Sequence, residues 1–121
     1  MKRLPRINNA LYIGVRVGTD ARRAASCNPC VALRWMLDGK TVGGAALRGP
    51  EETSTRENAL RMYTQGSAWF AFAEKERGSL EVGKLADLAE SKDYFKVPVE
   101  EIGEIGAVMT VVGVRVVYDK R

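Results

Sequence analysis

The chain has 121 residues, of which 45% are hydrophobic and 28% are charged, and its formal net charge is +4. These values are ordinary for a globular protein and allow one domain with a modest core. No apolar run approaches the roughly 20 residues that a membrane-spanning helix needs, so we expect no membrane partner. The basic residues lack interleaved aromatics, which predicts a solvated surface and no nucleic-acid partner.

The chain contains no histidine. Histidine is the commonest ligand of catalytic zinc and the commonest general base, so this chain alone cannot form a histidine-dependent hydrolase. The start, Met1 to Arg6, is basic, but Asn8, Asn9 and Arg16 make it a poor match to a secretory signal. We therefore expect a cytoplasmic protein.

The first predicted element is a buried strand over residues 10–17, which are rich in β-formers. Gly18, Thr19 and Asp20 follow it directly, so the strand ends in a carboxylate. In a β/α barrel this edge carries the catalytic groups. Alternatively, Asp20 caps the next helix or turn, and the spacing alone favours this second interpretation.

Cys27 and Cys30 form a Cys-x-x-Cys pair. A structural zinc site needs two further ligands, and the chain has no other cysteine and no histidine to supply them. A redox dithiol would open a helix, which is compatible with the helical run that follows Cys30. We nevertheless interpret the two cysteines as incidental thiols without a disulfide.

Two helices are predicted in the middle of the chain. Residues 31–37 form a short amphipathic helix that ends at Asp38-Gly39, and residues 38–50 are a glycine-rich loop. The second helix begins with a capping box, Ser54 to Glu57. Its predicted buried face consists of five residues at helical spacing: Ala59, Leu60, Tyr63, Ser67 and Phe70.

The end of the second helix has two further features. The small residues at 66–68 would allow another element to approach closely. The aromatic residues Trp69, Phe70 and Phe72 end the helix and are interpreted as core.

The segment from Arg77 to Leu88 reads RGSLEVGKLADL. Gly78 and Gly83 predict turns with positive φ, and a strand is expected from Leu85. Residues 90–94 are expected to form a turn and residues 98–102 a brief helical turn.

Two β-rich runs, 107–112 and 114–118, then surround Gly113 and predict a hairpin. In the proteins that the motifs described below resemble, this turn usually has a second glycine where Val114 stands. A β-branched residue resists positive φ, so the hairpin should be strained or its turn rebuilt.

Four motifs together resemble the metal-dependent amidohydrolases, specifically the YtcJ-like branch known as amidohydrolase family 3. They are VGTDAR at 17–22, GKTVGG at 39–44, the E-x-A-L-R-x-Y-T pattern at 57–64, and the segment 77–88. The resemblance covers nearly the whole chain but only the C-terminal end of the family's length. A β/α barrel takes about 250 residues, so the chain is too short to form one.

The resemblance implies an α/β fold: the C-terminal fragment of a TIM-type (β/α)8 barrel plus strands of a small composite β-domain. Residues 1–76 would hold the last barrel strand and closing helices, and residues 77–121 the return strands of the β-domain. The apolar faces of the strand at 10–17 and of the helix ending at Phe70 would then lack partners within this chain.

The resemblance also implies a role for Asp20, as a metal ligand or as the acceptor of a proton from the attacking water. The full-length family is expected to use zinc or another divalent metal, held by histidines that this chain lacks. We therefore expect part of a hydrolase of carbon–nitrogen bonds in a small, non-peptide amide-type substrate, inactive alone and with no metal bound by this chain alone. The alternative is a non-catalytic module derived from that family, which self-associates or docks onto a partner through its exposed core face.

Overall fold

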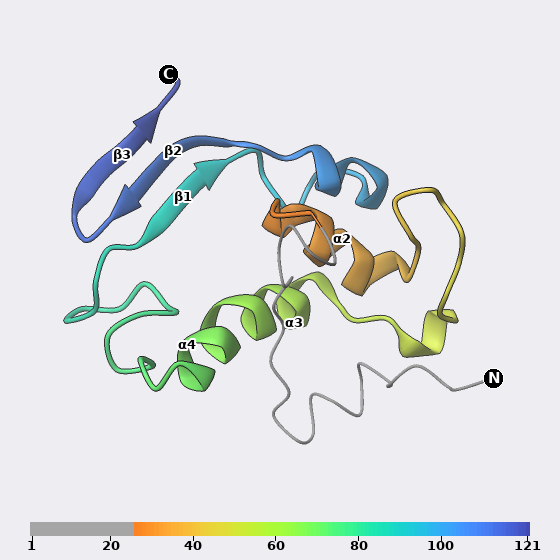
Figure 1. Ribbon diagram of the computed structural model, residues 1–121, viewed down its shortest axis with the longest axis horizontal. Helices are drawn as coiled ribbons and strands as arrows, with labels where there is room; N and C mark the ends of the chain where they lie inside the picture. Colours follow the sequence, from red (N-terminus) through yellow and green to blue (C-terminus); the bar gives the residue numbers. More distant parts are fainter. Residues whose placement is uncertain (1–25) are drawn as a thin grey trace.

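The computed structural model describes residues 26–121 (Figure 1). The predicted strand at 10–17 and Asp20 lie outside this range and remain predictions. The described elements follow one another in the order α2 (Pro29–Asp38), η1 (Pro50–Glu52), α3 (Arg56–Arg61), η2 (Met62–Gly66), α4 (Ser67–Phe70), β1 (Leu88–Ser91), η3 (Val99–Glu104), β2 (Ala107–Val112) and β3 (Arg115–Asp119). They make a mixed fold of helices and one small antiparallel sheet, while its origin in a barrel remains a prediction.

Helix α2 has conventional signals at both ends. The Asn28 side chain accepts a hydrogen bond from the backbone N–H of Cys30, and Pro29 occupies the first turn, where no backbone donor is needed. At the other end Gly39 has φ 64° and donates its N–H to the carbonyl of Trp35. The helix predicted at 31–37 is thus confirmed and slightly longer.

The second helix begins one residue later than predicted. Thr55, and not Ser54, is the cap, because its hydroxyl accepts the backbone N–H of Asn58 at 3.2 Å. The backbone N–H of Ser54 donates to the carbonyl of Met36 at 2.9 Å. This bond fixes Ser54 in the connection to α2, so the chain turns into helix only at Arg56.

The segments α3, η2 and α4 form one continuous helix with a π turn in its middle. A π turn pairs residue i with i+5, so it shifts the buried face relative to a 3.6-residue period. Met62, Gly66 and Ala68 are buried as a result. Of the predicted face, Ala59 is buried, but Phe70 is exposed.

The interpretation of the terminal aromatic residues as core is wrong. Trp69, Phe70 and Phe72 are all exposed, and Phe72 retains 92% of its accessible surface. The π turn explains the error for Phe70. It rotates the end of the helix relative to a regular α-helix, so that Ala68 faces the core instead of residues 67 and 70. Phe72 lies beyond the helix, at φ 56°.

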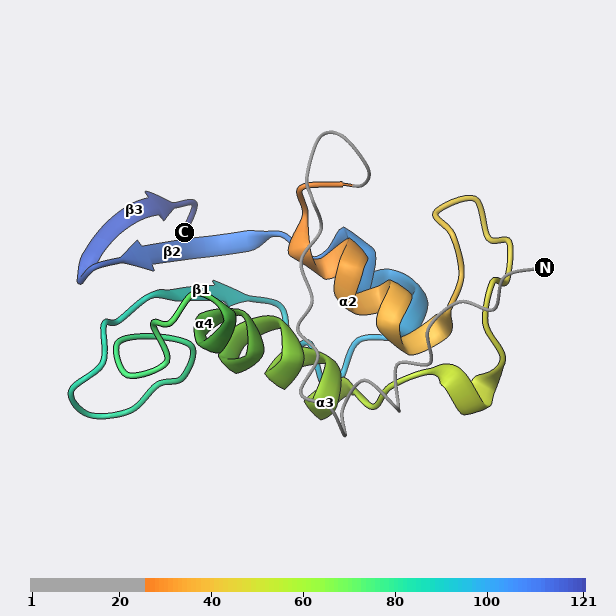
Figure 2. The same cartoon turned by 60° about the horizontal axis from the view of Figure 1, so that its bottom comes forward.

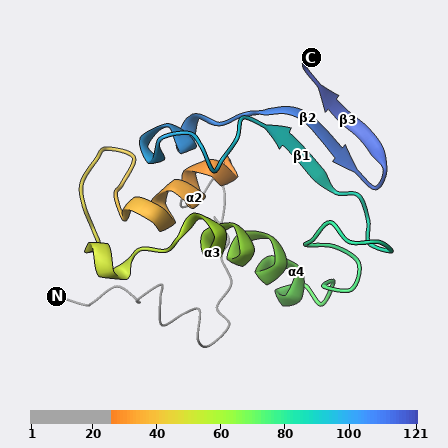
Figure 3. The same cartoon turned by 180° about the vertical axis from the view of Figure 1, so that it is seen from behind.

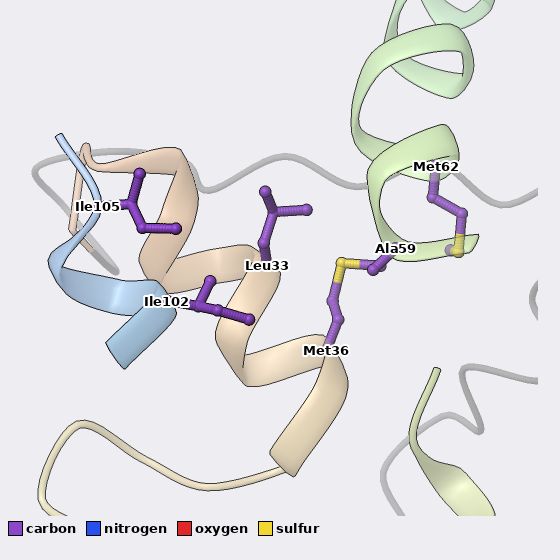
Figure 4. Packing of buried hydrophobic residues seen from close by; sticks show 6 residues of the cluster. All are labelled: Leu33, Met36, Ala59, Met62, Ile102 and Ile105. Atoms are coloured by element: carbon purple, nitrogen blue, oxygen red, sulfur yellow. The ribbon is translucent and has the colours of Figure 1, made fainter. Parts of the chain in front are cut away.

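The core lies between α2, α3 and η3 (Figure 4). Met36 and Ile102 are fully buried, and the remaining members are Leu33, Ala59, Met62 and Ile105. Arg56 fastens the connection before η3 to this core, since its guanidinium donates to the carbonyls of Tyr94 and Val97. The core contains residues from both sides of the predicted domain boundary at residue 76. The division of the chain into two domains remains a prediction.

The turns predicted by the glycines after the helix are confirmed. Gly78 has φ 97° and Gly83 has φ 94°. A Cβ atom on Gly78 would lie 2.6 Å from that of Ala68 and 3.2 Å from the Cα of Gln65. The small residues at 66–68 therefore admit a close backbone approach, as predicted.

Strand β1 starts later than expected, at Leu88 instead of Leu85, because the backbone N–H of Leu85 closes a loop with the carbonyl of Glu76 at 2.8 Å. It also continues through Glu90 and Ser91, which were predicted to begin a turn. Both residues pair with β2. Their polar side chains gave no indication in the sequence that the backbone would find this partner strand. The helical turn predicted at 98–102 is confirmed as η3.

The sheet has the antiparallel order β1–β2–β3 (Figures 1 and 3). The predicted hairpin is confirmed: β2 and β3 are joined at Gly113, with φ 55°, and Val114, with φ 68°. Two positive φ values are what a type I′ turn requires, and a β-branched residue resists them. The predicted strain is therefore present at Val114. No helix within residues 26–121 is long and apolar enough to span a bilayer.

Candidate functional site

The segment nearest to Asp20 that the structure describes is the start of α2. Ser26 accepts the backbone N–H of Asn28 at 3.1 Å, and the Asn28 amide donates to the carbonyl of Gly103 at 3.1 Å. One side chain thus caps α2 and ties it to η3.

The two cysteines of this segment differ in their surroundings. Cys27 is exposed, whereas Cys30 is half-buried against the core, and both are free thiols. Burial raises the pKa of the Cys30 thiol above its ordinary value. A reactive cysteine at a helix start normally has a lowered pKa, so the half-burial of Cys30 and the opposite direction of its pKa shift favour the incidental interpretation for this residue.

The charged side chains of α2 and the following loop serve the fold. Arg34 and Asp38 form an ion pair at 3.1 Å, and Asp38 also accepts the backbone N–H of Lys40 at 2.9 Å. The Arg48 guanidinium lies 3.9 Å from the centre of the Trp35 ring, a cation–π contact. Burial lowers the pKa of Arg48, and the charge of Glu52 opposes this shift.

A metal site cannot be assembled from the described residues. Between residues 26 and 121 no three His, Cys, Asp or Glu side chains are grouped so that they could hold a metal ion. The whole chain has no histidine. The described residues therefore do not fit the divalent metal that the resemblance implies. The predicted metal-site residue, Asp20, is outside the described range and its role stays a prediction.

The segment 77–88 has a structural role that sequence reasoning missed. The Asp87 carboxylate accepts the backbone N–H of Gly113 at 2.7 Å and lies 3.8 Å from the Arg77 guanidinium. It thereby holds the tip of the strained β2–β3 hairpin. Asp87 was predicted only as a polar strand position, and no local pattern reveals a partner 26 residues away.

A second cluster in this segment closes the turn at Gly83. The Lys84 ammonium donates to the Ser79 hydroxyl at 2.7 Å and lies 3.4 Å from the Glu81 carboxylate. The hydrogen bond from Ser79 and then Lys84 lower the pKa of Glu81, which is fully exposed. Residues of the segment 77–88 thus close a turn and hold the tip of the β2–β3 hairpin.

The comparison against protein families gives a separate finding. A model described as "Amidohydrolase family" matches residues 1–118. The chain belongs to the amidohydrolase family. The match includes both Asp20 and the segment 77–88, so the resemblance read from the motifs is confirmed.

Among characterised proteins, this amidohydrolase chain is similar to an N-substituted formamide deformylase from Arthrobacter pascens. The two are 36% identical over an alignment of 88 residues, and the alignment covers 68% of this chain and 15% of the relative. The chain thus spans only a small part of the relative's length. No solved structure matches the chain.

Proposed function

We propose that this chain is part of a metal-dependent hydrolase that cleaves carbon–nitrogen bonds in small, non-peptide amides. The family match over residues 1–118 is the observation that carries the proposal. The relative's name supports the bond class, because an N-substituted formamide is an amide. The chain's small share of that relative's length supports a part rather than the whole of such an enzyme.

Within that enzyme the chain would supply the last barrel strand, its helices and the return strands of a small β-domain. Asp20 would contribute one carboxylate at the end of the strand predicted at 10–17. Imidazole ligands would have to come from polypeptide outside this chain, since it has no histidine. The chain alone is therefore expected not to turn over substrate.

A chimeric enzyme tests this proposal. The segment of the Arthrobacter pascens deformylase that aligns with this chain is replaced by the chain, and hydrolysis of an N-substituted formamide is measured. The controls are the deformylase without that segment and the chain alone. We expect hydrolysis by the chimera and by neither control. A folded chimera that does not hydrolyse the substrate would contradict the proposal.

A further inference from the structure

One end of the molecule exposes several large apolar side chains. The end of α4, the loop after it and the tip of the β2–β3 hairpin lie at the same end of the long axis in all three views (Figures 1, 2 and 3). We name this surface the apolar end and define it by five exposed residues: Phe70, Phe72, Leu80, Val82 and Val114. All five side chains are largely exposed, and large apolar side chains exposed in the same region often mark a binding surface.

Phe72 is held at the apolar end by strained backbone. The backbone N–H of Ala73 donates to the carbonyl of Ala68 at 2.9 Å, and that of Phe72 to the carbonyl of Trp69 at 3.0 Å. These are the two hydrogen bonds of a Schellman motif, in which the residue at the Phe72 position is usually glycine. Phenylalanine occupies it at φ 56° and is 92% exposed.

Val114 repeats this combination at the hairpin tip. Among residues 26–121, Phe72 and Val114 are the non-glycine residues with positive φ, and both are large, apolar and exposed. Neither side chain gains enough burial within the described fold to offset its backbone strain. Strain of this kind is common where a side chain is presented to a ligand or partner.

We infer that the apolar end is an interface for the remaining polypeptide of the amidohydrolase, with Phe72 as its central anchor. This inference rests on the proposed function. The occupant follows from length, since the aligned region is only 15% of the deformylase, which leaves most of that polypeptide to cover apolar surface. Phe72 meets the description of an anchor, because an exposed aromatic side chain fixed in one backbone conformation loses little entropy on binding.

The first test measures access to position 72. Phe72→Cys and the matched control Phe95→Cys are made both in the full chain and in the chimera with the deformylase. Phe95 is also exposed, but it lies in the connection before η3 and outside the apolar end. Iodoacetamide labelling is followed peptide by peptide with mass spectrometry. We expect the new thiol at position 72 to be labelled about tenfold or more slowly in the chimera than in the chain alone, with little change at position 95.

The second test uses Phe72→Asn, because asparagine tolerates positive φ better than phenylalanine. We expect this substitution to raise the thermal midpoint of the chain alone and to lower that of the chimera. A rise in both, or equal labelling at position 72 in both, would overturn the inference. Protection in the chain alone that grows with its concentration would also overturn it, in favour of a second copy.

These outcomes separate the interface from the proposed function. An inactive chimera with a protected position 72 supports the interface and contradicts the function, whereas an active chimera with an accessible position 72 does the reverse. If the chimera does not fold, the chain is coexpressed with the rest of the deformylase as a separate polypeptide. Lack of protection at position 72 in that mixture then counts against the interface.

Discussion

Replacing Val114 by glycine should stabilise the protein, although it removes an apolar side chain. Val114 has φ 68° in the β2–β3 turn, and a left-handed conformation costs an L-residue about 1–2 kcal/mol. The side chain is 76% exposed, so its removal forfeits only about 0.5 kcal/mol of burial, roughly a quarter of a fully buried valine. After a further entropic cost of about 0.4–1 kcal/mol for glycine in the unfolded chain, the expected net gain is small, at most about 1 kcal/mol.

The assay is thermal unfolding followed by circular dichroism, with urea unfolding as a check on the free energy. For a chain of this size the gain corresponds to a rise in the midpoint of up to about 6 °C. Val117→Gly is the matched control, because Val117 is an exposed valine in β3 without positive φ. It should destabilise, since glycine weakens a strand interior. If Val114→Gly destabilises the chain as much as Val117→Gly does, the strain argument is wrong.

Further predictions concern Asp87, Met36 and the two cysteines. Asp87→Ala removes the acceptor for the N–H of Gly113 and should cost about 0.5–1.5 kcal/mol in urea unfolding; no loss would mean that water replaces the carboxylate. Met36→Ala empties a fully buried position and should cost about 2–5 kcal/mol by the same assay, so a cost below about 1 kcal/mol would place Met36 outside the core. Ellman's reagent at pH 8 should react faster with the exposed Cys27 than with the half-buried Cys30, and comparable rates would contradict the burial of Cys30. Burial raises the pKa of the Cys30 thiol. The contribution of the neutral thiol to stability is therefore present below the unfolded pKa of about 8.5 and is lost as pH rises through the folded pKa. The thermal midpoint should accordingly fall more between pH 7 and 10 for the parent chain than for Cys30→Ala.

The elements that could be predicted from the sequence have signals within a few residues of one another. Gly39 ends α2 one residue after its last turn, and Gly78 and Gly83 adopt the positive φ that their turns require. The hairpin was predictable because two β-rich runs flank Gly113, and its strain because a β-branched residue follows. In each case the controlling physics is the local backbone preference of one residue.

The features that sequence reasoning missed depend on distant partners or on helix geometry. Asp87 holds a turn 26 residues away, and Asn28 caps α2 while donating to Gly103, 75 residues away. The π turn at η2 changed which side of the helix is buried, so the aromatic end of α4 was wrongly assigned to the core. The candidate site itself was predicted from a single residue, Asp20. The family match shows that the chain belongs to the amidohydrolase family but does not test the role of that residue.

Catalysis by the chimera with the deformylase, compared between Asp20→Asn and Asp93→Asn, tests the central claim most directly. Asp93 is a matched control because its exposed carboxylate accepts the N–H of Phe95 and pairs with Lys96 at the surface. We predict that Asp20→Asn lowers kcat/KM at least about 100-fold, as expected for a group that acts on the reacting atoms, while Asp93→Asn leaves it nearly unchanged. Equal activities of the two variants would show that Asp20 does not belong to the catalytic site.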